Sequence, residues 1–397
     1  MNESNKTSPV TLRPSTRLIH AGRPDSRTVS APVYHASTVL FRDYQELVAR
    51  EAAPNDRAHM YYGRKGTPTT RALEDALTTL DGSLGAILSP SGVASITDVL
   101  LCFLKPGDQL LMVDTAYGPT RRFCQRNLAE RGISTRFYDP LLGSNIEAML
   151  QPNTRMIFME SPGSATMEVQ DVPALCDVAR AAGALTAIDN TWATPLLFNP
   201  LDFGVDLAIQ SGTKYLNGHA DCFFGVTTSR DRSLLDALSR YTQTTGSHLA
   251  PDDANLALRG LRTLPVRLAQ HEQNTKQLLN WLSGRAEVTR VLHPDQPGHP
   301  GHSCYTRDFN GGSGLFSLVL ALKTEENLAR FVDALRVFGI GFSWGGFESL
   351  CLPMQAERSV STFSLGAGEF LVRLHIGLED PEDLMADLEN AFTAAAR

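Results

Sequence analysis

Helical and strand-like patterns of apolar residues alternate along the chain from residue 69 onward. The first helical stretch, 69–80, places on one face Ala72, Leu73, Ala76, Leu77 and Leu80. Short apolar runs follow and predict strands at 85–88, 109–113, 134–138, 156–159, 184–188, 207–210 and 223–227. Helix-like stretches lie between several of them, at 93–104, 120–131 and 173–182. Apolar strands separated by helices predict a mostly parallel sheet that helices cover on both faces.

The chain changes character after this repeating part. Residues 230–260 have mainly helical spacing, and 264–283 predict one long helix that leads into a smaller C-terminal domain. Strands are expected there at 315–321 and 371–376, and helices at 325–338 and 381–396. The predicted fold is therefore α/β, with a large domain over 61–260 and a smaller α+β domain over 261–397.

The first 60 residues differ from both domains, because their hydrophobic periodicity is weak and prolines interrupt them. These prolines are Pro9, Pro14, Pro24 and Pro32. A segment with so little core of its own is expected to be an arm, residues 1–60, that lies across a neighbouring subunit.

Composition narrows the class of protein. The 397 residues are 42% hydrophobic and 20% charged, as is typical of a soluble globular protein. The net charge of −7 disfavours nucleic acid as a partner, because phosphate binding needs a basic surface. No apolar run approaches the roughly 18 residues that cross a bilayer, and the polar N-terminus does not resemble a secretory signal. The six cysteines are scattered without a Cys-x-x-Cys pair, which indicates reduced thiols in a cytoplasmic protein.

The predicted strand 207–210 runs into Ser-Gly-Thr-Lys at 211–214, a turn of small residues that presents Lys214. A lysine held out of bulk water has a lowered pKa and can act as an amine nucleophile. The chemistry that most needs such an amine is a Schiff base with pyridoxal phosphate (PLP). A solvated surface lysine is the alternative that this stretch alone leaves open.

A PLP site also needs a cradle for the phosphate, and the turn at 88–96 offers one. Gly92 and Val93 begin a predicted helix there, whose free N–H groups and positive end favour an anion. Ser211 and Thr213 can add hydroxyl donors to the same phosphate. An ordinary capped helix would show the same pattern around Gly92.

Two residues are candidates for contacts with the pyridine ring. Asp189 ends an apolar strand, where a buried carboxylate is costly unless it pairs with a cation such as a protonated ring nitrogen. Tyr117 lies in a loop after strand 109–113, where it can stack on a planar ring. Asp189 as a helix cap or turn residue, and Tyr117 as a surface tyrosine, are the alternatives.

Two arginines are candidates for anion binding. Arg64 lies beside Tyr62 where the arm ends, and it would contact a phosphate in bidentate fashion. If the arm crosses to a partner, these residues complete the partner's site. Arg373 lies inside an apolar strand and needs an anion, which is either a substrate α-carboxylate or a protein salt-bridge partner.

Other site types have little support. His293, His299 and His302 lie in a stretch rich in proline and glycine, which indicates a covering loop, and no metal is expected. No Gly-x-Gly-x-x-Gly or Gly-x-Ser-x-Gly follows a predicted strand, which argues against a dinucleotide site and a serine-hydrolase elbow.

Taken together, the motifs resemble the Cys/Met-metabolism PLP enzymes of fold type I, most closely the bacterial cystathionine β-lyases. The matching segments are Tyr-Gly-Arg at 62–64, Ser-Pro-Ser-Gly-Val-Ala-Ser at 89–95, Glu-Ser-Pro-Gly-Ser at 160–164, Ala-Ile-Asp-Asn-Thr-Trp at 187–192, Ser-Gly-Thr-Lys-Tyr-Leu-Asn-Gly-His at 211–219, Gly-Leu-Arg-Thr-Leu at 260–264 and Phe-Ser-Trp-Gly-Gly-Phe-Glu-Ser-Leu at 342–350. The resemblance extends from about residue 15 to the C-terminus.

The resemblance implies a role for each candidate. Lys214 carries the cofactor as an imine and is catalytic, Asp189 pairs with the ring nitrogen, and Tyr117 stacks on the ring and takes part in catalysis. The phosphate is held by Gly92, Val93, Ser211 and Thr213, with Tyr62 and Arg64 from a neighbouring subunit. The substrate is bound by Tyr62, Tyr117, Ser343, Trp344 and Arg373, the last three at its α-carboxylate. The implied assembly is a homotetramer of two dimers.

The implied reaction is β-elimination, which converts L-cystathionine to L-homocysteine, pyruvate and ammonia in methionine biosynthesis. Trp344 supports the β-lyase branch, because γ-lyases and γ-synthases usually have leucine there. Phe342 stands where the better-known β-lyases have tyrosine, so the exact thioether stays open. Cysteine desulfhydrase, cystathionine γ-lyase and methionine γ-lyase are the sibling alternatives, and a PLP-binding regulator without catalysis is the remote one.

Overall fold

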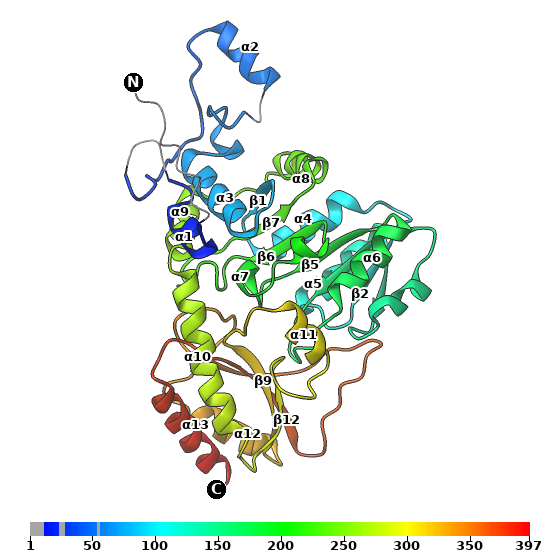
Figure 1. The fold of residues 1–397 in the computed structure, drawn as a ribbon, viewed down its shortest axis with the longest axis vertical. Coiled ribbons are helices and arrows are strands. Elements are labelled where there is room, and N and C mark those ends of the chain that lie inside the picture. The colour runs from blue at the N-terminus through cyan, green and yellow to red at the C-terminus, as the bar shows by residue number, and fades with distance from the viewer. Residues whose placement is uncertain (1–11, 24–27, 54–55) are drawn as a thin grey trace, which may run out of the picture.

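The computed structural model describes residues 12–23, 28–53 and 56–397 (Figure 1). At its centre is a seven-stranded sheet in the order β1-β7-β6-β5-β4-β2-β3. Strand β7 is antiparallel to β1 and β6, and the other neighbours are parallel. The strands are β1 (Gly85–Ser89), β2 (Gln109–Val113), β3 (Ser134–Tyr138), β4 (Thr154–Glu160), β5 (Leu185–Asp189), β6 (Leu207–Ser211) and β7 (Gly225–Ser229). The prediction of a mostly parallel sheet is confirmed.

Strands β4 and β7 each begin two residues away from the predicted start, and the reason is visible at β7. This strand begins at Gly225 rather than at residue 223, opposite Ser211 of β6. The backbone passes so close to the start of helix α4 (Gly92–Phe103) that a Cβ atom on Gly225 would lie 2.3 Å from the Ser91 carbonyl oxygen. Only glycine allows this approach, so the ladder starts there.

Helices pack on the sheet as predicted: α4 on β6 and β7, α6 on β4 and β5, and α8 on β1 and β7. Local signals set their ends; Asp171 caps α6 by accepting the Ala174 N–H, and Gly183 ends it in the left-handed conformation. The helical segments of this part are η1 (Gly63–Lys65), α3 (Pro68–Asp81), α4 (Gly92–Phe103), α5 (Gly118–Phe123), η2 (Cys124–Leu128), η3 (Gly143–Met149), α6 (Val172–Ala182), α7 (Thr194–Leu197), η4 (Pro200–Phe203), α8 (Arg232–Thr245) and α9 (Pro251–Leu261).

The predicted helical stretch 120–131 is helical in the structure, but it is not a regular α-helix. Helix α5 continues from Cys124 as the π-helical segment η2, and residues 129 and 130 are α-helical again. Apolar periodicity indicates that a helix is present, but it does not distinguish i→i+4 from i→i+5 hydrogen bonding.

A second, smaller sheet follows the long helix α10 (Leu264–Leu282), which runs from the central sheet to the lower part of the molecule (Figure 1). Its order is β10-β11-β12-β9-β8, antiparallel except between β10 and β11. Two of its strands were predicted, whereas β8, β10 and β11 were not. This part contains β8 (Val288–Leu292), α11 (His302–Asp308), β9 (Leu315–Ala321), α12 (Glu325–Ala334), β10 (Gly339–Ile340), β11 (Leu350–Met354), β12 (Glu369–His375) and α13 (Pro381–Ala395).

Helix α12 ends at Ala334, earlier than the predicted end at residue 338. The carboxylate of Asp387 on α13 accepts the backbone N–H groups of Arg336, Val337 and Phe338 at 2.8–3.1 Å. These donors would otherwise bond to carbonyls one turn back. A tertiary contact therefore terminates the helix.

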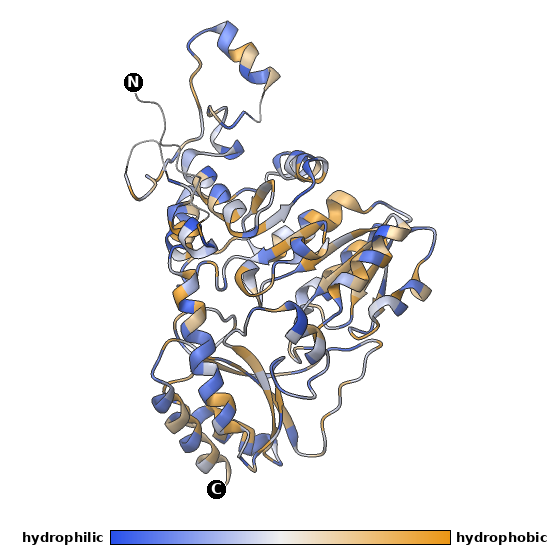
Figure 2. Cartoon of the chain, viewed as in Figure 1, coloured by the Kyte–Doolittle hydropathy of each residue, from blue (hydrophilic) through white to orange (hydrophobic). Residues whose placement is uncertain are grey.

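The strands of both sheets are mostly hydrophobic, and the helices show both hydrophobic and hydrophilic residues (Figure 2). The larger core cluster surrounds the central sheet, and a second cluster lies between the smaller sheet and helices α10, α12 and α13. Within the described residues, we find no helix whose length and apolarity would allow it to cross a bilayer.

The N-terminal segment has two different parts. Helix α1 (Pro14–His20) packs on its own chain, since Leu18 is fully buried and its carbonyl accepts from Arg262. Helix α2 (Tyr44–Ala52) buries no side chain and protrudes from the body (Figure 1). Of the expected arm, residues 1–11, 24–27 and 54–55 lie outside the described residues.

Candidate active site

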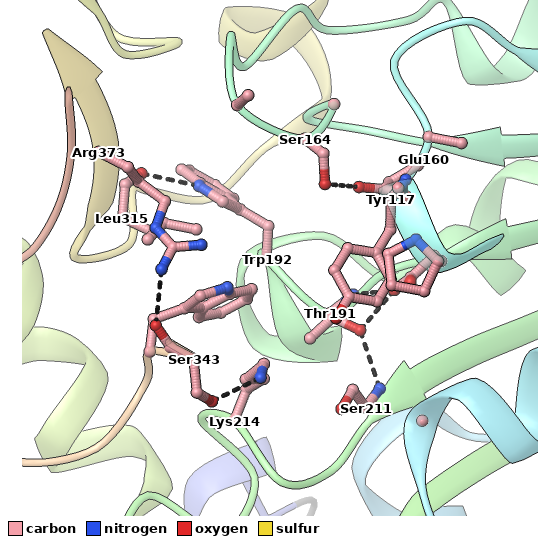
Figure 3. A pocket seen from close by; sticks show the side chains of 18 of the residues that line it. Tyr117, Glu160, Ser164, Thr191, Trp192, Ser211, Lys214, Leu315, Ser343 and Arg373 are labelled. Atoms are coloured by element: carbon pink, nitrogen blue, oxygen red, sulfur yellow. Dashed lines mark hydrogen bonds between the residues drawn. The ribbon is translucent and has the colours of Figure 1, made fainter. Parts of the chain in front are cut away.

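A cavity of about 640 Å³ opens at the carboxyl ends of β4, β5 and β6 and is closed on its other side by residues of the smaller sheet (Figure 3). This is the edge at which ligands of parallel sheets bind. Ten of the predicted site residues line the cavity: Gly92, Val93, Tyr117, Asp189, Ser211, Thr213, Lys214, Ser343, Trp344 and Arg373. The fold therefore brings together groups from both sheets.

Lys214 lies in the turn after β6, with its amine inside the cavity. Its Nζ donates to Ser343 Oγ at 2.6 Å. Burial, and then the positive charge of Arg373, lower the pKa of Lys214 to about 8, although the carboxylate of Asp189 opposes them. The structure thus rejects the alternative of a solvated surface lysine. An amine of this pKa is partly unprotonated near neutral pH and can act as a nucleophile or base.

Asp189 lies buried at the end of β5. Its Oδ1 accepts the Thr191 N–H at 3.0 Å and the Thr191 hydroxyl. Burial raises the pKa of Asp189, and the bonds from Thr191 only partly offset that effect. A cation bound in the cavity would relieve the cost of this buried charge.

Glu160 is a second carboxyl group at the same edge, opposite Asp189 in the β4–β5 register. It accepts the Tyr117 N–H and the Ser164 hydroxyl, each at 2.7 Å. Burial and then the charge of Asp189 raise the pKa of Glu160 to about 8. Glu160 therefore fixes the backbone of the loop that presents Tyr117, whose ring is partly exposed in the cavity.

The start of helix α4 forms a concave surface beside the lysine. Ser91 caps the helix by accepting the Ala94 N–H at 3.1 Å, and the first N–H groups of a helix have no partner within it. Gly92 lies so close to Ser211 that a Cβ atom on Gly92 would be 2.4 Å from Ser211 Cβ. Backbone donors and the Ser211 side chain thus meet where an anion such as a phosphate can bind.

Arg373 on β12 faces the cavity and donates from Nη2 to the Ser343 carbonyl oxygen at 2.9 Å. Burial lowers its pKa to about 10, against the opposing effect of Tyr117 and Cys351. Among the described residues no carboxylate forms an ion pair with it, so the salt-bridge alternative is not realised. The guanidinium is available for a carboxylate brought by a ligand.

Figure 3 shows Lys214 between Ser343 and Arg373 on one side and Thr191 and Tyr117 on the other. Trp344 lies over the lysine, with Nζ 5.6 Å from the ring centroid. Phe342, which stands where the better-known β-lyases have tyrosine, lines the mouth of the cavity and is 88% exposed.

Two predicted residues do not reach the cavity of their own chain. Arg64 donates to the Gln243 carbonyl oxygen near the end of α8, and the Tyr62 hydroxyl accepts from Ser37 at 3.4 Å. The single chain therefore leaves both outside, whereas the resemblance expects them in a neighbouring subunit's site.

Sequence reasoning assigned no role to several residues that line the cavity. Glu160 shows the same signal as Asp189, an acidic residue at the end of an apolar strand, and could have been found by it. Gln355, Glu357 and Arg358 come from the loop between β11 and β12, and no periodic pattern indicates where such a loop lies.

Asp114 anchors that loop. Its buried carboxylate forms an ion pair with Arg121 at 2.9 Å and accepts the N–H groups of Ser359, Val360 and Ser361. Burial alone would raise the pKa of Asp114, but the hydrogen bonds outweigh it and lower the pKa to about 2. The carboxylate therefore stays ionised and holds the loop over the cavity.

Replacing Asp114 by asparagine should lower the free energy of unfolding by about 3–5 kcal/mol, because the Arg121 charge stays buried without its partner. Glu357→Gln is the matched control, since it removes the exposed Arg122–Glu357 pair of the same loop and should cost at most about 1 kcal/mol. Urea denaturation measures both. Equal midpoints for the two variants would contradict the anchoring role.

The stretch 293–302 contains an irregular loop that is exposed at residues 295, 297, 298 and 300, but two of its three histidines point inward. His293 and His299 are buried, and His299 and His302 contact the carbonyl oxygens of Met167 and Pro294 at 2.7 and 2.8 Å. Over residues 12–23, 28–53 and 56–397, no cluster of histidine, cysteine, aspartate or glutamate is arranged to hold a metal ion.

The cavity fits PLP. It offers a desolvated amine for an imine, a buried carboxylate for the ring nitrogen and a helix start for the phosphate. Its volume also lies in the range of about 300–1,000 Å³ that is usual for cofactor sites. Fold and site together define a PLP-dependent enzyme of the α/β class.

Comparison with known proteins gives the family. The sequence profile of the Cys/Met metabolism PLP-dependent enzymes matches residues 15–393, and the chain belongs to this family. The cystathionine beta-lyases of Escherichia coli (strain K12) and Salmonella typhimurium (strain LT2) are 42% and 41% identical to it, over 95% of this chain and 97% of each relative.

A solved structure agrees with the fold. Cystathionine gamma synthase from Xanthomonas oryzae pv. oryzae, in complex with cystathionine, superposes with a TM-score of 0.88 at 32% identity, over 97% of this chain and 99% of that one. The predicted fold, cofactor and enzyme class are confirmed.

Proposed function

We propose that this chain is a cystathionine β-lyase, which cleaves the Cβ–S bond of L-cystathionine and, with the uptake of one water molecule, releases L-homocysteine, pyruvate and ammonia in methionine biosynthesis. The observation that carries the proposal is one cavity that combines the amine of Lys214, the carboxylate of Asp189 and the available guanidinium of Arg373. Relatives with this activity in their names, which match nearly the whole chain, support the choice of substrate.

Bound PLP supplies an electron sink that stabilises the negative charge developing at the substrate Cα. Lys214 Nζ removes the Cα proton, for which its pKa of about 8 is suitable, and then holds that proton close to the departing sulfur. Ser343 Oγ keeps the amine in place at 2.6 Å. Lys214 is therefore both the base of the first step and the acid of the second.

The other residues bind and orient. With PLP bound, the negative charge of Asp189 would keep a proton on the ring nitrogen, and Tyr117 would stack on the ring. The start of α4 at Gly92 and Val93, with the hydroxyls of Ser211 and Thr213, would hold the phosphate. The substrate α-carboxylate is bound by Arg373, Ser343 and Trp344.

We further propose that the active form is a cytoplasmic homotetramer of two dimers. Each chain then consists of an arm (1–60), a large domain (61–260) and a small domain (261–397). Tyr62 and Arg64, which directly follow the arm, complete a neighbour's site, and their side chains lie outside the cavity of their own chain. The absence of buried side chains on α2 and the 90% exposure of Leu40 support a partner surface there.

The test is incubation of the purified protein with cystathionine, cystine, cysteine and methionine, with identification of the keto acid from each. Cystathionine should give pyruvate. Release of 2-oxobutyrate from cystathionine or methionine would instead assign a γ-lyase, and pyruvate from cysteine alone would assign a desulfhydrase. Bound PLP without any product would favour a regulatory protein.

A further inference from the structure

Two buried histidines lie behind the lysine and have no part in the chemistry above. His375 is on β12, two residues beyond Arg373, so both side chains emerge on the same face of the strand. His271 is on α10, with its ring centroid 5.3 Å from that of His375. Both rings are fully buried.

The His375 ring contacts the segment 343–346, which lies over Lys214. Its Nε2 is 3.2 Å from the Gly345 N and 3.0 Å from the Gly346 carbonyl oxygen. Two residues earlier, Arg373 holds the Ser343 carbonyl. Two side chains on one face of β12 therefore contact the segment at both ends, Arg373 at Ser343 and His375 at Gly345 and Gly346.

The segment needs such support. Ser343 has φ +78°, a left-handed conformation that costs a non-glycine residue on the order of 1–3 kcal/mol. A Cβ atom on Gly345 would lie 2.8 Å from the Tyr215 N and 2.9 Å from the Lys214 carbonyl carbon. The segment is thus pressed against the backbone of the lysine while its own conformation is strained.

The His375 ring is neutral. Burial, the neighbouring His271 and the charges of Arg373 and Lys214 hold its pKa at about 3. In one tautomer Nε2 accepts the Gly345 N–H, and in the other it donates to the Gly346 carbonyl oxygen. In both tautomers the ring bonds to the backbone of segment 343–346. Among the described residues, His375 Nδ1 and His271 Nε2 have no hydrogen-bond partner, so Nε2 makes the hydrogen bonds of the His375 ring.

We propose that His375 is a positioning residue of the active site, which holds segment 343–346 by its backbone so that Ser343 meets both Lys214 and a carboxylate bound at Arg373. The inference rests on the proposed function for the role of Lys214. It assigns to His375 no contact with substrate or cofactor.

The experiment uses the holoenzyme of five variants: His375→Asn, His375→Ser, His375→Gln, His271→Asn and Ser343→Ala. Glutamine can place its amide oxygen near the position of Nε2, whereas asparagine and serine are too short to reach Gly345. His271→Asn retains a group near Nδ1 for the Ile376 carbonyl and tests packing alone. Two readouts are needed: steady-state kinetics and the pH midpoint of the absorbance change of the bound cofactor.

H375N and H375S should lower kcat/KM by about tenfold or more, since they remove a buried hydrogen bond and misplace reacting groups. The pH midpoint of the absorbance change in H375N and H375S should move in the same direction as the midpoint in S343A. In the double variant S343A/H375N, the midpoint should move no further than in S343A alone. H375Q and H271N should keep the midpoint of the unmodified enzyme. If one of the two variants with a shortened side chain, H375N or H375S, does not fold, the other is sufficient for the test.

An unchanged midpoint in the folded truncation, or an equal shift in H271N, would overturn the proposal, because His375 would then contribute packing only. An equal shift in H375Q would overturn it too. Failure of the proposed function looks different: the unmodified protein itself would then show no cofactor absorbance that depends on pH, or no product from cystathionine.

Discussion

Replacing Lys214 by alanine should reduce turnover by at least about 10³-fold, the largest effect expected for any substitution in this chain. General base catalysis alone contributes about 10²–10⁴-fold, and here the same nitrogen is both base and acid. The variant should also lose the imine absorbance of the bound cofactor, because no other described lysine lines the cavity. Pyruvate release and the absorbance spectrum measure the two effects.

The matched control is Lys276→Ala. Lys276 lies on the exposed side of α10, where it pairs with Glu272, and its loss should leave turnover and spectrum unchanged. A Lys214→Ala enzyme that kept the rate of the unmodified enzyme would refute the assignment of the reacting amine. Recovery of part of the rate by added small amines would support it, since the cavity would then hold the missing base.

Replacing Asp189 by asparagine should lower kcat by about 10²–10³-fold, the usual effect of removing one preorganised electrostatic group. Asparagine retains an oxygen for the Thr191 donors but carries no charge, so the ring nitrogen loses the partner that keeps it protonated. The cofactor should still bind, because the phosphate contacts at α4 do not involve this side chain. Cofactor content and single-turnover rates measure the two effects separately.

Asp202→Asn is the control for that substitution, because Asp202 forms an exposed ion pair with Arg230 away from the cavity. It should leave kcat unchanged. If D189N retained the kcat of the unmodified enzyme with full cofactor content, Asp189 would not be the partner of the ring nitrogen. Loss of the cofactor in D189N would instead assign to Asp189 a role in binding.

The elements of the central sheet were largely predictable, because alternating apolar strands and helices carry their own periodicity. The strands β2, β3 and β9 have the bounds that the pattern predicts. The errors in the predicted elements occur where a contact with a distant part of the chain decides where an element ends or whether it forms. Asp387 ends α12 early, and the short strands β10 and β11 depend on pairing with each other and with β12.

The site divides in the same way. Lys214, Asp189 and Gly92 were identified because each follows or ends a strand in a pattern that local chemistry explains. Glu160 carried the same signal but was given no role, and the anchoring of loop 355–361 by Asp114 has no local signal at all. Arg64 was proposed as a phosphate contact from its place at the end of the arm, and the resemblance added Tyr62. The single chain does not bring either residue to its own cavity.

By itself, the sequence determined the order of strands and helices around the central sheet, the class of cofactor and the amine proposed to receive it, because these depend on residue types at short spacing. Only the tertiary structure decided which groups surround that amine. The groups near Lys214 include Ser343, Arg373 and His375, which lie 129 or more positions away from it in the sequence. Arg373 and His375 share one face of β12. Such contacts depend on how the smaller sheet packs against the larger one, and no local pattern of residues encodes that packing.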